Sequence, residues 1–253
     1  MTQSGVRVAV AGGSGLVGRY VVQALRSAGH EPVVLARSAG VDLVTGEGVE
    51  AAMDGVERVV DVSNVATLRR ATATAFFEAV TARLLTAGRQ AGVRHHVTLS
   101  IVGVDRVAFG YYQAKLRQEQ LVLGSAAPVT VLRATQFHEF ADQQLQRGGP
   151  LGGTVAVVPR MRCQPVAARE VASALAELVV AEPAGLAPEL AGPRPEDLPD
   201  MVRRLLHARG VRRRVVVVPV PGAAGQAMAQ GELLPTGPGP RGTQTFDEWL
   251  ADA

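Results

Sequence analysis

The sequence VRVAVAGGSGLVG at residues 6–18 joins a strand, a glycine-rich turn and the beginning of a helix. Residues 6–11 are mostly apolar and β-branched, which predicts a short buried strand. Residues 12–18 satisfy both G-x-G-x-x-G and G-x-x-G-x-x-G, and apolar side chains then recur at helical spacing until Gly29. Glycines in this context let backbone N–H groups approach a pyrophosphate at a helix N-terminus. We therefore expect the pyrophosphate of a dinucleotide to be held by Gly12, Ser14, Gly15, Leu16 and Val17.

Strands and helices continue to alternate along the first 150 residues. The expected strands lie at residues 32–36, 58–62, 95–99 and 129–133, and the expected helices at 16–28, 49–53, 72–91 and 111–123. Such alternation with short connections is typical of an α/β fold with a doubly wound parallel sheet. Residues 1–150 are therefore interpreted as a Rossmann core that binds the cofactor.

The pattern loosens after residue 150. The expected elements there are strands at 154–159 and 214–219 and helices at 171–181, 198–208 and 246–251. Residues 151–253 are interpreted as a small C-terminal substrate lobe, integral to the same domain. Because ligands of open α/β sheets bind beyond the carboxyl ends of the strands, a substrate is expected between that edge and the lobe.

Composition argues against several classes of protein. Hydrophobic residues make up 47% of the chain, no apolar run approaches the roughly 20 residues of a membrane span, and the N-terminus shows no signal-peptide pattern. Cys163 is the single cysteine, so an internal disulfide is impossible and a reducing cytoplasm is expected. The net charge of +3 does not indicate a nucleic-acid partner, and the basic run at 209–214 is interpreted as a solvated helix end. His95 and His96 have no carboxylate at ligand spacing, so no metal is expected.

The end of the second expected strand indicates which dinucleotide binds. An NAD site has an acidic residue about 20 positions beyond the glycines, where it bonds the ribose 2′-hydroxyl. This chain instead has L-A-R-S at residues 35–38, with no carboxylate. Arg37 and the Ser38 hydroxyl are suited to a 2′-phosphate. NADP(H) is therefore expected in preference to NAD(H), the alternative being that Arg37 is an ordinary surface arginine.

Lys115 is the single lysine in a chain that has 25 arginines. A compact ammonium in such a chain indicates a site where a guanidinium does not substitute. Lys115 follows Tyr111 by four residues, which places both side chains on one helix face. A nearby cation favours tyrosinate, so Tyr111 is expected to be the general acid toward a carbonyl that accepts hydride, with Tyr112 as the fallback. Ser100, after the strand 95–99, is expected to bond the same oxygen; the alternative is that Tyr111 packs in the core.

These residues together resemble the short-chain dehydrogenase/reductase superfamily. The resemblance rests on GGSGLVG at 12–18, on Ser100 and on YYQAK at 111–115, although Ser100 stands slightly closer to Tyr111 than is common. LRATQF at 132–137, QPV at 164–166, the expected helix at 170–181 and FDEWL at 246–250 look like the atypical, NmrA-like branch.

The resemblance implies further site residues. Ser63 and Asn64 would line the cofactor, and Lys115 would bond the nicotinamide ribose. Thr135, on the cofactor side, and Gln136 and Phe137, on the substrate side, would border the nicotinamide. Independently of the resemblance, His138 and Glu139 follow Phe137 directly and are weaker candidates for substrate contact; a packing or helix-start role is the favoured alternative for both.

The leading hypothesis is an NADPH-dependent oxidoreductase that reduces a small carbonyl, enone or quinone-like molecule, with Tyr111 as proton donor. Two alternatives stay open. One is a non-catalytic NADP(H) redox sensor, for which a Tyr-x-x-x-Lys pair is unnecessary. The other is a nucleotide-sugar epimerase or dehydratase with tightly held NAD, against which Arg37 and the short lobe argue. The expected partner is a small-molecule substrate, and the chain is expected to be a monomer or a homodimer.

Overall fold

The computed structural model describes residues 5–147 and 154–252, and their contacts fall into two compact units. The first unit comprises the chain up to Ser100 together with Gly110–Arg133 and Arg169–Ala187. The second unit comprises Ile101–Phe109, Ala134–Ala168 and the chain from Pro188 onward. The chain therefore passes between the units several times.

The first unit is built on a six-stranded sheet in the order β2-β1-β3-β4-β5-β8. Its strands are β1 (Arg7–Ala11), β2 (Glu31–Leu35), β3 (Arg58–Asp61), β4 (His95–Ile101), β5 (Val129–Ala134) and β8 (Gly185–Leu186). Its helices are α1 (Leu16–Ser27), the 3-10 turn η1 (Arg37–Ala39), α2 (Val49–Ala52), α3 (Arg70–Gln90), α4 (Gly110–Leu123) and α6 (Ala168–Val180). The pairs β1–β2, β1–β3, β3–β4 and β5–β8 are parallel.

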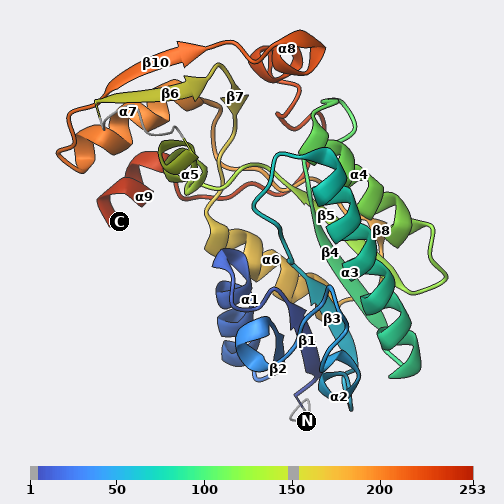
Figure 1. Cartoon of the computed structure of the whole chain (residues 1–253). Coiled ribbons are helices and arrows are strands. Elements are labelled where there is room, and N and C mark those ends of the chain that lie inside the picture. The colour runs from blue at the N-terminus through green and yellow to red at the C-terminus, as the bar shows by residue number, and fades with distance from the viewer. Residues whose placement is uncertain (1–4, 148–153, 253) are drawn as a thin grey trace. The chain divides into compact units, whose positions relative to one another are not determined.

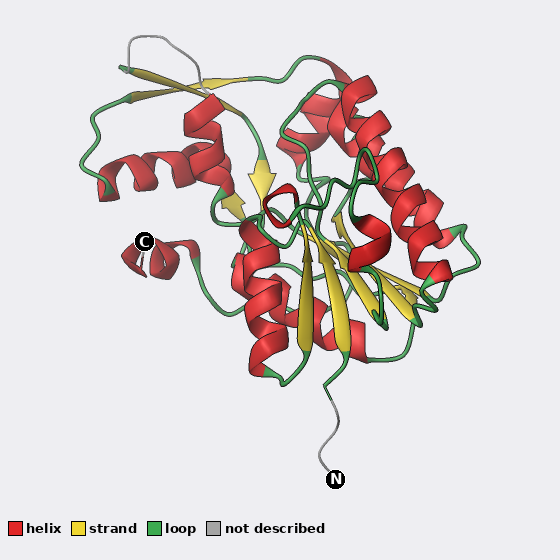
Figure 2. Cartoon of the chain, turned by 60° about the horizontal axis from the view of Figure 1, so that its bottom comes forward, coloured by secondary structure: helices red, strands yellow, loops and turns green. Residues whose placement is uncertain are grey.

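Helices cover both faces of this sheet, with α1 and α6 on one side and α3 and α4 on the other (Figures 1 and 2). Residues 8–11 of β1 are fully buried because the strand is covered from both sides. Ala9 and Ala11 of β1 belong to a core cluster that also contains Val80 and Leu84 of α3. Small side chains on the strand let the helix lie close. The predicted α/β fold with a doubly wound parallel sheet is confirmed.

The strand order places a change of direction at β1. The chain goes from β1 to β2 on one side, and β3 then pairs with the other side of β1. In the common order 3-2-1-4-5-6 a further strand lies beyond the second one; here residues 41–48 form turns instead. The reversal at β1 is the position where ligands of open α/β sheets bind, beyond the carboxyl ends of the strands.

The second unit contains a two-stranded parallel sheet and several helices. Its elements are α5 (Phe140–Arg147), β6 (Val155–Pro159), β7 (Arg162–Cys163), β9 (Glu196–Asp197), α7 (Leu198–Ala208), β10 (Arg214–Val218), α8 (Gly222–Gln230) and α9 (Phe246–Asp252). Strand β6 pairs with β10, and β7 pairs with β9 in antiparallel fashion. Helix α7 buries one apolar face, which includes Leu198, Met201 and Leu205. None of the helices that the structure describes is long and apolar enough to cross a membrane.

Truncation of a side chain in the α3 core cluster tests this packing. Leu84 is fully buried, whereas Leu68 is 55% exposed. Leu84→Ala is expected to lower the free energy of unfolding by about 2–5 kcal/mol, because it removes buried methyl groups and leaves a cavity. Leu68→Ala, the same chemical change on the surface, is expected to stay within about 0.5 kcal/mol of wild type. Urea denaturation followed by circular dichroism measures both, and equal losses in the two variants would contradict the assigned core.

Candidate functional site

The glycine turn packs tightly against the end of β3. Gly12 has φ +77°, and a Cβ on it would lie 2.9 Å from Ser63 Cα and from the Val62 carbonyl oxygen. A Cβ on Gly18 would lie 2.1 Å from the Gly12 carbonyl oxygen. Only glycine is compatible with these approaches, so the motif is explained by backbone packing in addition to any ligand.

The turn also has the features of an anion site. Ser14 and Gly15 are exposed at its tip, and α1 begins immediately afterwards at Leu16 with no side-chain cap and no acidic residue in its first turn. The positive end of the helix dipole is therefore not offset by a carboxylate there. The buried Ser63 hydroxyl, beside Gly12, has no hydrogen-bond partner within residues 5–147 and 154–252. A backbone cradle with an unpartnered hydroxyl fits a dinucleotide.

Arg37 and Ser38 lie exposed in η1, directly after β2. The structure also brings a carboxylate to this edge, that of Asp42, which accepts hydrogen bonds from the N–H groups of Val44 (2.7 Å) and Thr45 (3.0 Å). These bonds, chiefly the one from Thr45, hold the pKa of Asp42 below its ordinary value, and the charge of Arg37 adds to the effect. Asp42 was not predicted for this edge, because a carboxylate was sought only at residues 35–38, at the end of the second strand. The chain turns back after residue 39.

Tyr111 and Asn64, two residues predicted for the site, are in direct contact. The Tyr111 hydroxyl donates to Asn64 Oδ1 at 2.7 Å. The Tyr111 ring packs edge-to-face on Phe77, with a centroid distance of 5.9 Å. The neighbouring Tyr112 is buried. The tyrosine at the carboxyl end of β3 is therefore Tyr111.

The Lys115 side chain points into the first unit. Its Nζ donates to the Leu99 carbonyl oxygen at 2.7 Å and to Gln118 Oε1 at 2.5 Å, and it lies 4.7 Å from the centre of the Phe77 ring. Burial lowers the pKa of Lys115 from its ordinary value to about 8, although the charges of Asp61 and Glu119 oppose this shift. The single lysine is thus a buried amine whose pKa lies closer to neutral pH than that of an exposed lysine.

Gln118 connects Lys115 to a buried carboxylate that sequence reasoning missed. Gln118 Nε2 donates to Asp61 Oδ2 at 2.9 Å, and Asp61 Oδ1 accepts the Ser63 N–H at 2.9 Å. Asp61 and Gln118 are each 1% exposed. Two signals were present in the sequence: a carboxylate ends the apolar strand VVD, and an amide follows Lys115 by three residues on the same helix.

Ser100 contacts a different group from the one expected. Its hydroxyl donates to Glu119 Oε2 at 2.8 Å, and Arg133 pairs with the same carboxylate, with Nη2 2.5 Å from Oε1 and Nε 3.1 Å from Oε2. All three residues are buried. Ser100 therefore supports an ion pair between α4 and β5, and its expected bond to a substrate oxygen stays a prediction.

The remaining predicted residues lie in the second unit. Thr135 Oγ1 donates to the Gln164 carbonyl oxygen at 2.6 Å. Gln136 is 9% exposed, and neither atom of its carboxamide has a hydrogen-bond partner in the described ranges of the chain. Phe137 is partly exposed. His138 is fully buried among the rings of Phe246 and Trp249, which favours the packing alternative for this residue.

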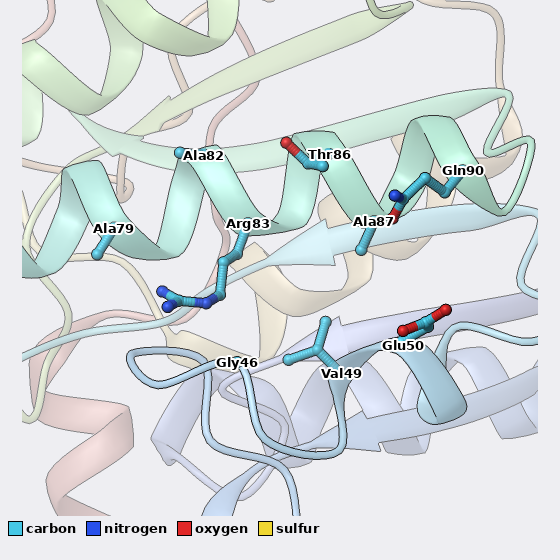
Figure 3. Close-up of a pocket in the computed structure, with 9 residues that line it drawn as sticks. All are labelled: Gly46, Val49, Glu50, Ala79, Ala82, Arg83, Thr86, Ala87 and Gln90. Atoms are coloured by element: carbon cyan, nitrogen blue, oxygen red, sulfur yellow. The ribbon is translucent and has the colours of Figure 1, made fainter.

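Two other features, a groove and a buried cysteine, contain none of the residues that were predicted for the site. A groove of about 450 Å³ lies between α2 and α3 (Figure 3), lined mainly by small side chains such as Ala79 and Ala82, with Arg83 Nη2 donating to the Thr45 carbonyl oxygen at 2.9 Å. Cys163 is a buried thiol, and burial raises its pKa to about 12. Across residues 5–147 and 154–252, no three or more His, Cys, Asp or Glu side chains are grouped to hold a metal ion.

Comparison with known proteins shows which solved structures share this fold. No protein-family model and no curated protein sequence matches the chain. A solved structure of a short-chain dehydrogenase/reductase superfamily protein from Agrobacterium tumefaciens with bound NAD does match, with a TM-score of 0.68 at 20% identity over 97% of this chain and 95% of that one. The chain therefore shares the fold of this structure.

Two further solved structures share this fold. The triphenylmethane reductase of Citrobacter sp. complexed with NADP(H) has a TM-score of 0.64 at 18% identity, over 91% of this chain and 92% of that one. The UDP-glucose 4-epimerase of Thermus thermophilus in complex with NAD has a TM-score of 0.68 at 18% identity, over 98% and 93%. The shared fold therefore extends over nearly the whole chain.

The contact between Ser100 and Glu119 can be tested through stability. Ser100→Ala is expected to lower the free energy of unfolding by about 1.5–3 kcal/mol, because it removes a buried hydrogen bond to a charged group. Ser173→Ala is the matched control, since the Ser173 hydroxyl lies on the exposed side of α6. Chemical denaturation measures both variants. Unchanged stability of Ser100→Ala would contradict a structural role for this hydroxyl.

Proposed function

We propose that the chain is an NADPH-dependent oxidoreductase that reduces a small carbonyl, enone or quinone-like molecule. One observation carries the proposal: the end of β3 touches both the dinucleotide cradle and the candidate acid. Ser63 packs on Gly12 of the glycine turn, and the next residue, Asn64, accepts the hydrogen bond from Tyr111. A cofactor cradle and a proton donor are thus joined through two consecutive residues.

The cofactor is assigned to residues of the first unit. Gly12, Ser14, Gly15, Leu16 and Val17 hold the pyrophosphate by backbone N–H groups and the dipole of α1. Arg37 and Ser38 hold a 2′-phosphate, and Ser63 and Asn64 line the site. The nicotinamide supplies the hydride when the dinucleotide is bound. NADP(H) is preferred over NAD(H) because Arg37 is exposed at the end of β2 and gives a planar fork of donors suited to phosphate.

Tyr111 is assigned the proton transfer. Its hydroxyl is fixed by Asn64 and donates its proton to the substrate oxygen as negative charge develops there. The ammonium of Lys115, one helical turn further along α4, stabilises the tyrosinate that results. We also assign to Lys115 a hydrogen bond to the nicotinamide ribose.

Ser100 can bond the substrate oxygen only if its hydroxyl leaves Glu119. The variant Ser100→Ala separates the structural role from the catalytic role of this hydroxyl. A small change in kcat supports the ion-pair role, and a loss of kcat at unchanged stability supports the catalytic role.

Substrate recognition is assigned to the second unit. It involves the lobe at residues 151–253 and the preceding segment at residues 135–138. Thr135 and Phe137 border the nicotinamide and the substrate. Gln136 is the strongest candidate for substrate contact, since its buried carboxamide lacks a partner in the part of the chain that the structure describes. A buried amide without a partner is costly, and a polar substrate group would satisfy it. His138 can contact the substrate only if its ring, which is buried in this structure, becomes accessible.

A second candidate function is nucleotide-sugar epimerisation or dehydration. The similarity of fold to a UDP-glucose 4-epimerase in complex with NAD motivates it. A panel of carbonyls, enones, quinones and UDP-sugars, each supplied with NADPH or NAD, discriminates the candidates. Saturable NADPH binding without turnover of any compound would instead support the redox-sensing alternative.

Removal of the Tyr111 hydroxyl tests the proton donor. Tyr111→Phe is expected to lower kcat by roughly 10²- to 10⁴-fold, because general acid catalysis contributes about that much. The Kd for NADPH is expected to stay nearly unchanged, since the phenol is not assigned to the cofactor. Tyr112→Phe tests the fallback acid, and Tyr20→Phe, on the surface of α1, is the control. Full turnover in Tyr111→Phe would overturn the assignment.

Removal of the Arg37 guanidinium tests the choice of cofactor. Arg37→Ala is expected to weaken NADPH binding by roughly ten- to a hundredfold, the worth of a charge-assisted bond, and to leave NADH binding nearly unchanged. Arg89→Ala, on the exposed side of α3, is the matched control. Fluorescence titration measures the Kd of NADPH and the Kd of NADH for wild type and for both variants. Equal weakening of NADPH and NADH binding, or none, would contradict the 2′-phosphate role.

A further inference from the structure

We propose that Asp61 and Gln118 are positioning residues that form a buried clamp on the Lys115 ammonium and fix both its location and its charge. The inference rests on the proposed function, because it concerns the lysine that is assigned to the site there. The Asp61 and Gln118 side chains together form the Lys115 clamp.

The hydrogen-bond chemistry of the clamp leaves only one arrangement. An ammonium has donors only, and a carboxylate has acceptors only. Gln118 lies between them, with Oε1 2.5 Å from Lys115 Nζ and Nε2 2.9 Å from Asp61 Oδ2. The carboxamide has one acceptor end and one donor end, so it is a neutral group that satisfies both charges at once. Reversal of the amide would set donor against donor and acceptor against acceptor.

The clamp also ties the lysine to the cofactor cradle. Asp61 is the last residue of β3, and its other oxygen accepts the N–H of Ser63, whose Cα packs on Gly12. A continuous line of contacts therefore runs from the glycine turn through Asp61 and Gln118 to Lys115. Displacement of the amide would release the ammonium from the strand whose end lines the cradle.

Groups from four elements face the ammonium, and they are not equivalent. Asp61 of β3 and Glu119 of α4 contribute negative charge, the Leu99 carbonyl of β4 accepts a hydrogen bond, and the Phe77 ring of α3 lies below the amine. The charge of Glu119 is largely offset by its ion pair with Arg133 of β5.

Asp61 has no such arginine partner in the part of the chain that the structure describes. His96 of β4 also faces Asp61, and burial lowers the pKa of that imidazole, which favours its neutral form. Asp61 is therefore the carboxylate that keeps Lys115 protonated near neutral pH.

The single lysine allows a direct measurement. Protein labelled with ¹³C at lysine Cε gives one side-chain NMR signal, and its pH titration reports the pKa of Lys115 without substrate or turnover. In wild type this signal is expected to titrate near pH 8. In Gln118→Met and in Asp61→Asn the midpoint is expected to fall by roughly one to two pH units, since each variant removes an interaction that favours the charged amine.

Two further variants make the test specific. Gln118→Glu replaces the amide by an acid, so it is expected to keep the lysine charged to equal or higher pH, opposite in sign to Gln118→Met. Gln120→Met is the matched control, because Gln120 is exposed on the same helix and its loss is expected to leave the titration unchanged. Should Asp61→Asn fail to fold, the opposed shifts of the two Gln118 variants decide the question.

The outcomes separate this inference from the proposed function. A titration midpoint that stays at the wild-type pH in Gln118→Met overturns the clamp, even where the protein turns over a carbonyl with NADPH. Opposed shifts in the two Gln118 variants support the clamp, even where no compound of the panel is reduced. In an active enzyme the fall of kcat/KM at high pH is expected to move with the NMR midpoint in each variant.

Discussion

The site in the first unit depends on the close approach of two backbones, the glycine turn and the end of β3. Gly12 has no side chain at the point where a Cβ would collide with Val62 and Ser63, so the turn lies directly on residues 62–63, and Gly18 in the same way lets α1 lie against Gly12. That approach places the exposed tip of the turn and the N-terminus of α1 at the reversal of the strand order, where an open α/β sheet binds its ligand. The strand end that the turn touches carries Asp61, Ser63 and Asn64. Asp61 accepts a hydrogen bond from Gln118, Ser63 packs on Gly12, and Asn64 accepts a hydrogen bond from Tyr111.

Much of this arrangement could be predicted from the sequence, because it depends on local patterns. The strand–turn–helix at residues 6–28 and the alternation up to residue 133 follow from periodicity and from glycine stops. Helices α5 and α8 were not predicted from the sequence, and α8 contains two glycines, Gly222 and Gly225. In α8, a Cβ on Gly225 would lie 1.8 Å from the Val220 carbonyl oxygen, so a residue that weakens a helix in isolation is required by contact with the preceding turn.

The sequence analysis proposed residues for the candidate site but did not predict the hydrogen bonds that these residues make in the structure. The spacing of Tyr111 and Lys115 indicated one helix face, yet the Tyr111 hydroxyl donates to Asn64 and the Lys115 ammonium donates to Gln118. Ser100 was placed correctly at the end of a strand, but its buried partner Glu119 lies nineteen residues away on a helix. Asp61 and Asp42 were missed for the same reason: hydrogen-bond partners set by tertiary packing leave no period in a sequence. A lone lysine signalled a special position without showing that the position is buried.

We propose that the glycine turn and the end of β3 bind a nicotinamide dinucleotide that carries a 2′-phosphate. Titration of the wild-type chain with NADPH and with NADH, followed by nicotinamide fluorescence at fixed ionic strength, measures this binding. Saturable binding of one NADPH per chain is expected, with a lower Kd than for NADH. If neither dinucleotide binds saturably, the glycine turn is not a dinucleotide site.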